Sequence, residues 1–244
     1  MQGANQGLRF KNGIKDGLPI GLGYLSVSFA FGVQAVLLGV PAFMAVFMSM
    51  TNLTSAGQLA GLTIIATLGT VLEIALTQLV INARYFLMSL TLSQKLDGSF
   101  TLSHRLLCSV FITDEIFAVA SAKTGCVNRR YIYGLAILPY LGWATGTFLG
   151  ATAGNILPQF ITNALGIALY AMFIAIIVPP SIKERGVLLA VVIGAILSAI
   201  LYYLPVFAII PTGFKIIISA VITASIIAYF FPIKEKGVND NGST

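Results

Sequence analysis

Long stretches without a charged residue constrain this chain more than any other feature of its sequence. No Asp, Glu, Lys or Arg occurs in the 56 residues from Gly17 to Leu72. A second uncharged run covers the 52 residues 131–182, and a third covers the 29 residues 186–214. One membrane-spanning helix needs only about 20 apolar residues. Each of the first two runs is therefore long enough to hold two spans.

The overall composition excludes several other classes of protein. Charged residues make up 9% of the 244 residues, whereas soluble domains carry about 25%. This scarcity excludes a soluble enzyme, a nucleic-acid-binding protein and a disordered chain. The net charge of +6 is not a nucleic-acid signature, because long apolar segments separate the basic residues.

Proline, glycine and charge positions predict an all-α, polytopic membrane protein with about eight transmembrane helices. The expected spans are 17–38, 42–66, 69–92, 105–122, 131–152, 159–179, 186–204 and 211–231. These spans form one transporter domain over residues 17–231. Residues 1–16 and 232–244 are expected to be polar segments on the cytoplasmic side.

The distribution of lysine and arginine predicts which side of the membrane each loop faces. With the N-terminus in the cytoplasm, eight spans place ten of the 14 basic residues inside and only Lys95 and Arg105 outside. The remaining two, Arg84 and Lys215, lie within spans. Cytoplasmic loops carry an excess of basic residues, so this split favours eight spans with both termini cytoplasmic.

Three charged residues are expected near the middle of neighbouring spans, where a charge needs a partner or a function. Arg84 lies in the third span, and Asp114 and Glu115 lie in the fourth. We predict that Arg84 pairs with one acid, preferentially Asp114, because adjacent helical residues point about 100° apart. The other acid is then available for a substrate ammonium group or a coupling proton. The alternative is an ion pair that only fixes the packing of the two helices.

The second predicted span contains the stretch TNLTSAGQ at residues 51–58. Such small and polar residues favour a break whose exposed N–H groups bind a substrate carboxylate, as in discontinuous transporter helices. The alternative is a continuous helix that packs closely through its small residues. Apolar neighbours such as Phe117 and Trp143 would hold an apolar side chain. The candidate substrate-binding residues are Asn52, Ser55, Gly57, Gln58, Asn82, Asp114, Glu115 and Trp143.

Two further features are expected to be structural. Glu73 lies one turn inside its predicted span, where its carboxylate is expected to reach the interface by snorkelling. Gly142, Gly146, Gly150 and Gly154 follow one another at four-residue spacing. That stripe predicts close contact with another helix.

In four of its motifs the chain resembles the AzlC family of branched-chain amino acid permeases. They are GLPI at 17–20 followed by Gly23-Tyr24, SAGQ at 55–58, NARY at 82–85 and TDE at 113–115. The resemblance covers about residues 8–232. It implies export of branched-chain amino acids across a bacterial cytoplasmic membrane, together with a small multispanning partner of the AzlD type.

Motifs that the sequence lacks narrow the mechanism. It contains no G-x-x-x-x-G-K-[ST] motif, so we expect secondary transport coupled to protons or another ion. It also lacks H-E-x-x-H and G-x-S-x-G, so no enzyme activity, metal or other cofactor is expected. The alternatives are a passive channel subunit and a membrane scaffold for a small partner.

Overall fold

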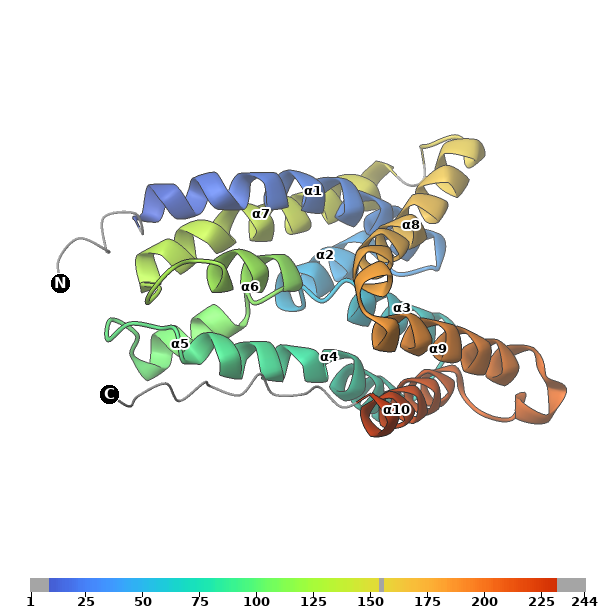
Figure 1. Cartoon of the computed structure of the whole chain (residues 1–244). Coiled ribbons are helices and arrows are strands. Elements are labelled where there is room, and N and C mark those ends of the chain that lie inside the picture. Colours follow the sequence, from blue (N-terminus) through green and yellow to red (C-terminus); the bar gives the residue numbers. More distant parts are fainter. Residues whose placement is uncertain (1–8, 154–155, 232–244) are drawn as a thin grey trace, which may run out of the picture.

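The computed structural model describes residues 9–153 and 156–231, where the regular elements are helices (Figure 1). Five of these helices, α1, α4, α7, α9 and α10, are long and apolar enough to cross a membrane. The prediction of an all-α membrane protein is therefore confirmed, whereas the count of eight spans is not. The bounds are α1 Phe10–Leu37, α2 Ala42–Thr51, α3 Ala56–Ala66, α4 Val71–Ser93, α5 Leu102–Ser109, α6 Asp114–Ser121, α7 Arg129–Ala153, α8 Gln159–Lys183, α9 Arg185–Tyr203 and α10 Thr212–Phe230, with a short 3-10 helix at Pro205–Phe207.

The first helix begins earlier than the sequence suggested. Residues 10–16 were expected to belong to a polar segment, but they form the first turns of α1. Asp16 binds Lys123 at 2.8 Å and accepts a hydrogen bond from Tyr131 at 2.6 Å, which ties these turns to α7 and the loop before it. Residues 1–8 and the predicted tail 232–244 lie outside the described residues.

Helices α1 and α7 lie side by side and run in the same direction, backbone against backbone (Figure 1). Gly142 rests on Gly21, and further along the pair Gly150 rests on Phe29. A methyl group on Gly142, Gly146 or Gly150 would overlap a carbonyl oxygen of α1. The predicted contact surface of the glycine stripe is thus confirmed for these three; the fourth glycine lies outside the described residues.

The second predicted span is interrupted at residues 52–55, as expected, and α3 then folds back along α2. Gln58 Nε2 donates to Ser49 Oγ at 3.0 Å, and Leu62 is buried in one cluster with Ala45. In a continuous helix Ala45 and Leu62 would lie about 25 Å apart. Helices α2 and α3 therefore form a hairpin that enters and leaves at the end where α1 and α7 finish.

The fourth predicted span, 105–122, is also interrupted, and the expectation of one continuous helix there was wrong. Helix α5 ends at Ser109 and α6 begins at Asp114. Thr113 caps α6, because its Oγ1 accepts the N–H of Ile116 at 3.4 Å. A capping threonine followed by two acids is typical of a helix start, so the sequence did contain a signal for this break.

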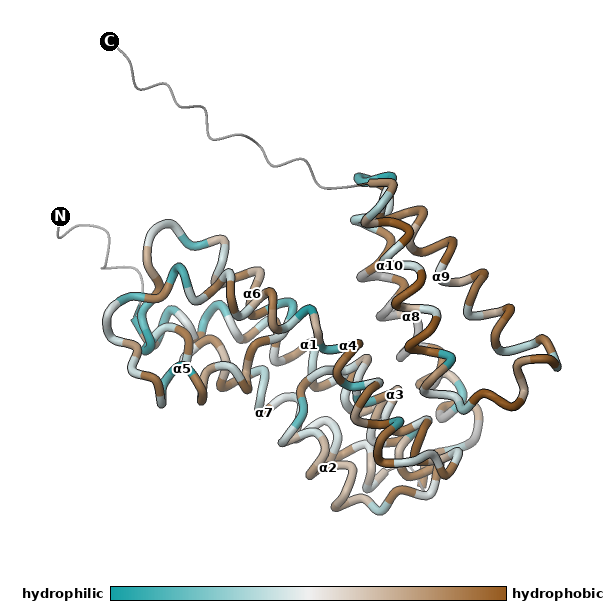
Figure 2. Tube along the Cα trace, turned by 90° about the horizontal axis from the view of Figure 1, so that it is seen from below, coloured by the Kyte–Doolittle hydropathy of each residue, from teal (hydrophilic) through white to brown (hydrophobic). Residues whose placement is uncertain are grey.

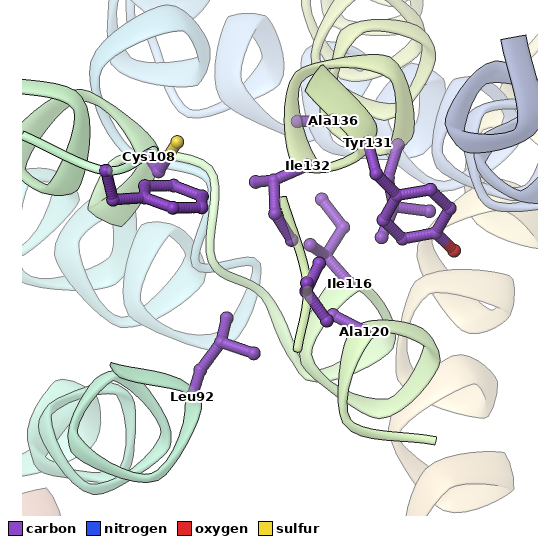
Figure 3. Packing of buried hydrophobic residues seen from close by; sticks show 10 residues of the cluster. Leu92, Cys108, Ile116, Ala120, Tyr131, Ile132 and Ala136 are labelled. Carbon is purple, nitrogen blue, oxygen red and sulfur yellow. The ribbon is translucent and has the colours of Figure 1, made fainter. Parts of the chain in front are cut away.

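The loops that precede α5 and follow α6 meet at one end of the molecule. Leu96 and Val127 form an isolated bridge, and Lys95 Nζ donates to the carbonyl of Lys123 at 2.9 Å. Figure 3 shows the core at this end, where side chains of α4, α5, α6 and α7 pack together. Helices α5 and α6 are thus a second hairpin. The expectation that Lys95 and Arg105 lie opposite the 123–130 loop was wrong.

The first six helices form two units, α1–α3 and α4–α6, in which the elements follow the same order but run in opposite directions. In each unit a long helix, α1 or α4, is followed by a hairpin of two short helices. The two hairpins enter from opposite ends, and their tips at 51–54 and 109–112 line one cavity. Hydrophilic residues gather at the end that holds the start of α1 and the 94–101 and 122–128 loops (Figure 2).

Labelling with a membrane-impermeant thiol reagent checks this arrangement. Cys126 is exposed in the loop after α6, and Gly98 is exposed in the loop before α5. All variants carry Cys108→Ala, so that Cys126 is their one native cysteine. The first variant reports labelling of Cys126, and a second variant, Gly98→Cys with C126S, reports labelling at position 98. The two positions are expected to react from the same side of the membrane. A cysteine at Leu68, which is 93% exposed in the link between α3 and α4, should react from the other side. Labelling of positions 98 and 126 from opposite sides would restore the eight-span topology.

Candidate functional site

The site lies where the two hairpin tips approach α1, α4, α7 and α8. A partly open cavity of about 170 Å³ lies there. Helices α3 and α6 both begin at this cavity, so each presents the positive end of its dipole to it. The lining residues are Tyr24, Leu53, Ser55, Ala56, Arg84, Tyr85, Thr113, Asp114, Glu115, Trp143 and Ile177.

The predicted ion pair between Arg84 and Asp114 is present in this cavity. Arg84 Nη1 lies 2.8 Å from Asp114 Oδ2, and the two side chains are 38% and 31% exposed. Arg84 Nη2 also donates to the hydroxyl of Tyr85 at 3.2 Å, and Arg84 Nε is buried without a hydrogen-bond partner in the described residues. The guanidinium group therefore neutralises one acid and keeps one donor unused at the edge of the cavity.

Glu115 is held differently, by neutral groups. Its carboxylate accepts a hydrogen bond from the Tyr24 hydroxyl of α1, which also lies 2.7 Å from Thr113 Oγ1. No basic side chain of the described residues lies within ion-pairing distance of Glu115. The arrangement leaves Glu115 suited to bind a cationic group of a ligand.

Of the four candidates around the first tip, only Ser55 lines this cavity. Gln58 is fully buried, donates to Ser49 and accepts the indole N–H of Trp143 at 2.9 Å, so it fixes the hairpin to α7. Gly57 packs tightly against Gln78. Both residues position the tip, and neither lies on the cavity wall.

Asn52 and Asn82 line a second, more polar cavity of about 210 Å³ between the two tips. Gln78 Nε2 donates to the carbonyl of Gly57 at 2.7 Å, which turns Gln78 Oε1 toward Asn82 Nδ2 at 2.9 Å. The Asn82 carboxamide oxygen is consequently left without a partner, as is the Thr54 hydroxyl, among the described residues. This cavity can accept hydrogen bonds but carries no charge.

Some wall residues were not identified from the sequence. Trp143 was predicted, and its ring lies edge-on to Tyr24 with 5.2 Å between the ring centroids. Phe117, the other expected apolar neighbour, packs instead against the core cluster of α4 to α7. Leu53 and Ile177 supply apolar surface in its place. Tyr24 belongs to a quoted motif, but nothing in that motif indicates that its hydroxyl reaches Glu115.

In the part of the chain that the structure describes, no three His, Cys, Asp or Glu side chains gather closely enough to hold a metal ion. The chemistry available at the site is therefore that of one ion pair, one carboxylate with neutral partners, two helix N-termini and an apolar wall. These groups can bind and orient a small zwitterion. They provide no activated nucleophile.

Comparison with known proteins gives consistent matches. The AzlC protein family matches residues 19–157. The chain is 31% identical over 205 residues to the inner membrane protein YgaZ of Escherichia coli strain K12, covering 81% of this chain and 84% of YgaZ. It is 22% identical over 179 residues to the branched-chain amino acid transport protein AzlC of Bacillus subtilis strain 168, covering 72% and 69% of the two chains. No solved structure matches the chain.

Proposed function

Because the chain belongs to the AzlC family, we propose that it is a secondary transporter subunit that exports branched-chain or similarly apolar amino acids. The observation that carries this proposal is the composition of the 170 Å³ cavity. It combines a carboxylate without a basic partner, the N-terminal ends of two half-helices and apolar side chains. These are the three features that a zwitterionic amino acid with an apolar side chain requires.

In the proposed binding mode each part of the substrate has a different partner. The ammonium group binds Glu115, and the carboxylate binds the N-terminal end of α3 near Ser55, where N–H groups and the helix dipole favour an anion. The branched side chain packs against Trp143, Leu53 and Ile177. The Arg84–Asp114 pair keeps the second acid of the cavity neutralised, so that only one carboxylate competes for the ammonium group.

We further propose a topology with six spanning helices and two hairpins that enter the membrane from opposite sides. The spanning helices are α1, α4, α7, α8, α9 and α10. In this topology Lys95 and Arg105 join the basic residues on the cytoplasmic side, and the basic loop residues number twelve inside and none outside. Both termini are then cytoplasmic, and the predicted transporter domain 17–231, extended to residue 10 by the first turns of α1, lies within a bacterial cytoplasmic membrane.

The relative in Bacillus subtilis carries the name of a branched-chain amino acid transport protein, which supports the substrate class. By the family resemblance, we propose that a small multispanning protein of the AzlD type completes the transporter. A passive channel subunit and a non-transporting scaffold for that partner are the alternatives. The charged cavity favours a transporter, because a scaffold has no need for a carboxylate directed into a cavity.

Efflux from intact cells tests the proposal. Cells loaded with a valine-containing dipeptide should retain more intracellular valine when the chain and its small partner are deleted, and the chain should restore export when supplied with the partner. The control is a dipeptide of glycine, whose product has no side chain to fill the apolar wall. Equal valine efflux with and without the two proteins would exclude this function.

A further inference from the structure

Glu73 is buried at the end of the molecule opposite the start of α1, and it does not snorkel to an interface as expected. Only 2% of its surface is exposed. Its carboxylate accepts the backbone N–H of Gly213, in the first turn of α10. No Lys, Arg or His of the described residues lies within ion-pairing distance. A buried carboxylate without a basic partner is costly in the ionised state, and within a membrane it indicates a functional site.

In the described residues, no basic side chain of the elements packed around Glu73 lies within ion-pairing distance of its carboxylate. Helix α3, whose last turn lies close to Glu73, contains no titratable residue, and neither does the 67–70 link. On α10 the nearest charged group is Lys215, two positions after Gly213, and its Nζ lies over the Tyr202 ring, 5.9 Å from the ring centre, without forming an ion pair with Glu73. On α4 the next charged residue is Arg84, eleven positions away, or about 16 Å along the helix. The charge of Glu73 is therefore free to change without breaking an ion pair.

Both protonation states of Glu73 have a partner. The N–H of Gly213, in the first turn of α10, donates to the carboxylate. Thr77, one turn further along α4, is fully buried, and its hydroxyl has no hydrogen-bond partner in the described residues. Both side chains lie against Gly213, so the Thr77 oxygen is placed to accept a hydrogen bond from a protonated Glu73.

We propose that Glu73 is the proton-binding site that couples transport to the proton gradient. The proposal rests on the proposed transport function and names the coupling ion that function left open. A proton from water on the proposed outer side, where Leu68 and Thr70 are exposed, forms an O–H bond on the carboxylate. A neutral carboxyl group accepts the Gly213 N–H more weakly, so protonation loosens the contact between α4 and α10.

Two helices connect this site with the substrate cavity. Helix α3 begins at Ala56 on the cavity wall, and its C-terminal turn packs beside Glu73. Helix α4 carries Glu73 in its first turn and Arg84 in the wall. A shift of either helix at Glu73 is transmitted to the cavity, because an α-helix moves as a rigid rod over this length.

The test uses the full chain, with any small partner that copurifies, in proteoliposomes. Leucine exchange without a gradient reports substrate binding and movement, and leucine accumulation driven by a pH gradient reports coupling. Glu73→Gln should keep exchange within about twofold and lose at least about tenfold of the driven accumulation. Glutamine still accepts the Gly213 N–H, so a residue that merely caps α10 would leave both activities unchanged. Glu184→Gln, at an exposed acid between α8 and α9, is the matched control.

Further readouts keep the proposal falsifiable. If Glu73→Gln does not fold, Glu73→Asp should fold and shift the pH dependence of driven accumulation, and an unchanged pH profile overturns the proposal. Infrared difference spectra recorded across pH should show a protonated carboxyl band in the wild type. Glu73→Gln should remove this band and Glu73→Asp should shift it. A band that stays unshifted in both variants also overturns the proposal. Absence of any leucine exchange by the wild type would refute the transport function. The infrared spectra need no transport activity, so they test proton binding by Glu73 separately.

Discussion

Replacing Arg84 with alanine is expected to stop branched-chain amino acid efflux while the chain still inserts and assembles with its partner. The substitution removes the partner of Asp114 and leaves two acids, Asp114 and Glu115, side by side in the cavity. Asp114 then competes with Glu115 for the substrate ammonium group, and a loss of about 1.4–2.8 kcal/mol in the productive binding mode corresponds to about 10- to 100-fold in substrate affinity. Because both side chains of the pair are about a third exposed, the loss of stability should be smaller than for a fully buried pair.

The measurement is the initial rate of valine efflux, normalised to the amount of protein in the membrane. Arg130→Ala removes an exposed arginine at the start of α7 and should export at the wild-type rate. The double exchange Arg84→Asp with Asp114→Arg separates the two roles of the pair. If it restores folding but not efflux, the arginine acts from its position on the cavity wall. Restoration of both would make the pair mainly structural, and normal efflux by Arg84→Ala would favour a scaffold.

The cost of charge in a membrane made the central ion pair predictable from the sequence. Arg84 and Asp114 are 30 positions apart, and the argument needed only that each be placed at similar depth in neighbouring segments. That prediction holds although α6 is a half-helix, because α6 still begins beside α4. The helix contact made by the glycine stripe was equally predictable, since four-residue spacing places Gly142, Gly146 and Gly150 on one face of any helix.

The course of the interrupted segments was not predictable by the same reasoning. Hydropathy reports how long an apolar segment is, and residues 105–122 are long enough to cross a membrane. It does not report whether the chain continues or turns back after a break. The loop charges did indicate that the chain turns back, because in the eight-span topology Lys95 and Arg105 were the two exceptions to an otherwise one-sided distribution of basic residues. Contacts such as Leu96 with Val127 depend on this turn and could not be inferred before it.

The sequence predicted which residues lie near the site better than it predicted the role of each residue. Gln58 and Ser55 belong to one motif, yet Gln58 points to Trp143 inside the protein while Ser55 lines the cavity. Residues on a half-helix that differ by three positions point in directions that depend on where the helix starts. The sequence indicated a break near residues 51–58 without giving its position. Ile177 is contributed by α8, which no local pattern connects with the two tips.

The largest expected loss of stability comes from the contact between α1 and α7. Replacing Gly142 with alanine places a methyl group on the carbonyl oxygen of Gly21. The obstacle is backbone of another helix, which cannot change rotamer, so the two helices must separate. Overpacking in a rigid interior costs about 1–3 kcal/mol, and we expect Gly142→Ala to lie near the upper end of that range. Gly142→Leu should yield no folded protein.

Trp143, the single tryptophan of the chain, follows Gly142 directly and donates its indole N–H to Gln58 in the first hairpin. Its fluorescence therefore reports thermal unfolding and any displacement of that hairpin in purified protein. Gly23→Ala is the matched control, because Gly23 lies in α1 near the same contact and has open space around it. Alanine favours a helix over glycine by up to about 1 kcal/mol, so this control should be neutral or slightly stabilising. If Gly142→Ala were as stable as Gly23→Ala, the two helices would not be in backbone contact, and the cavity walls that depend on Tyr24 and Trp143 would have to be placed differently.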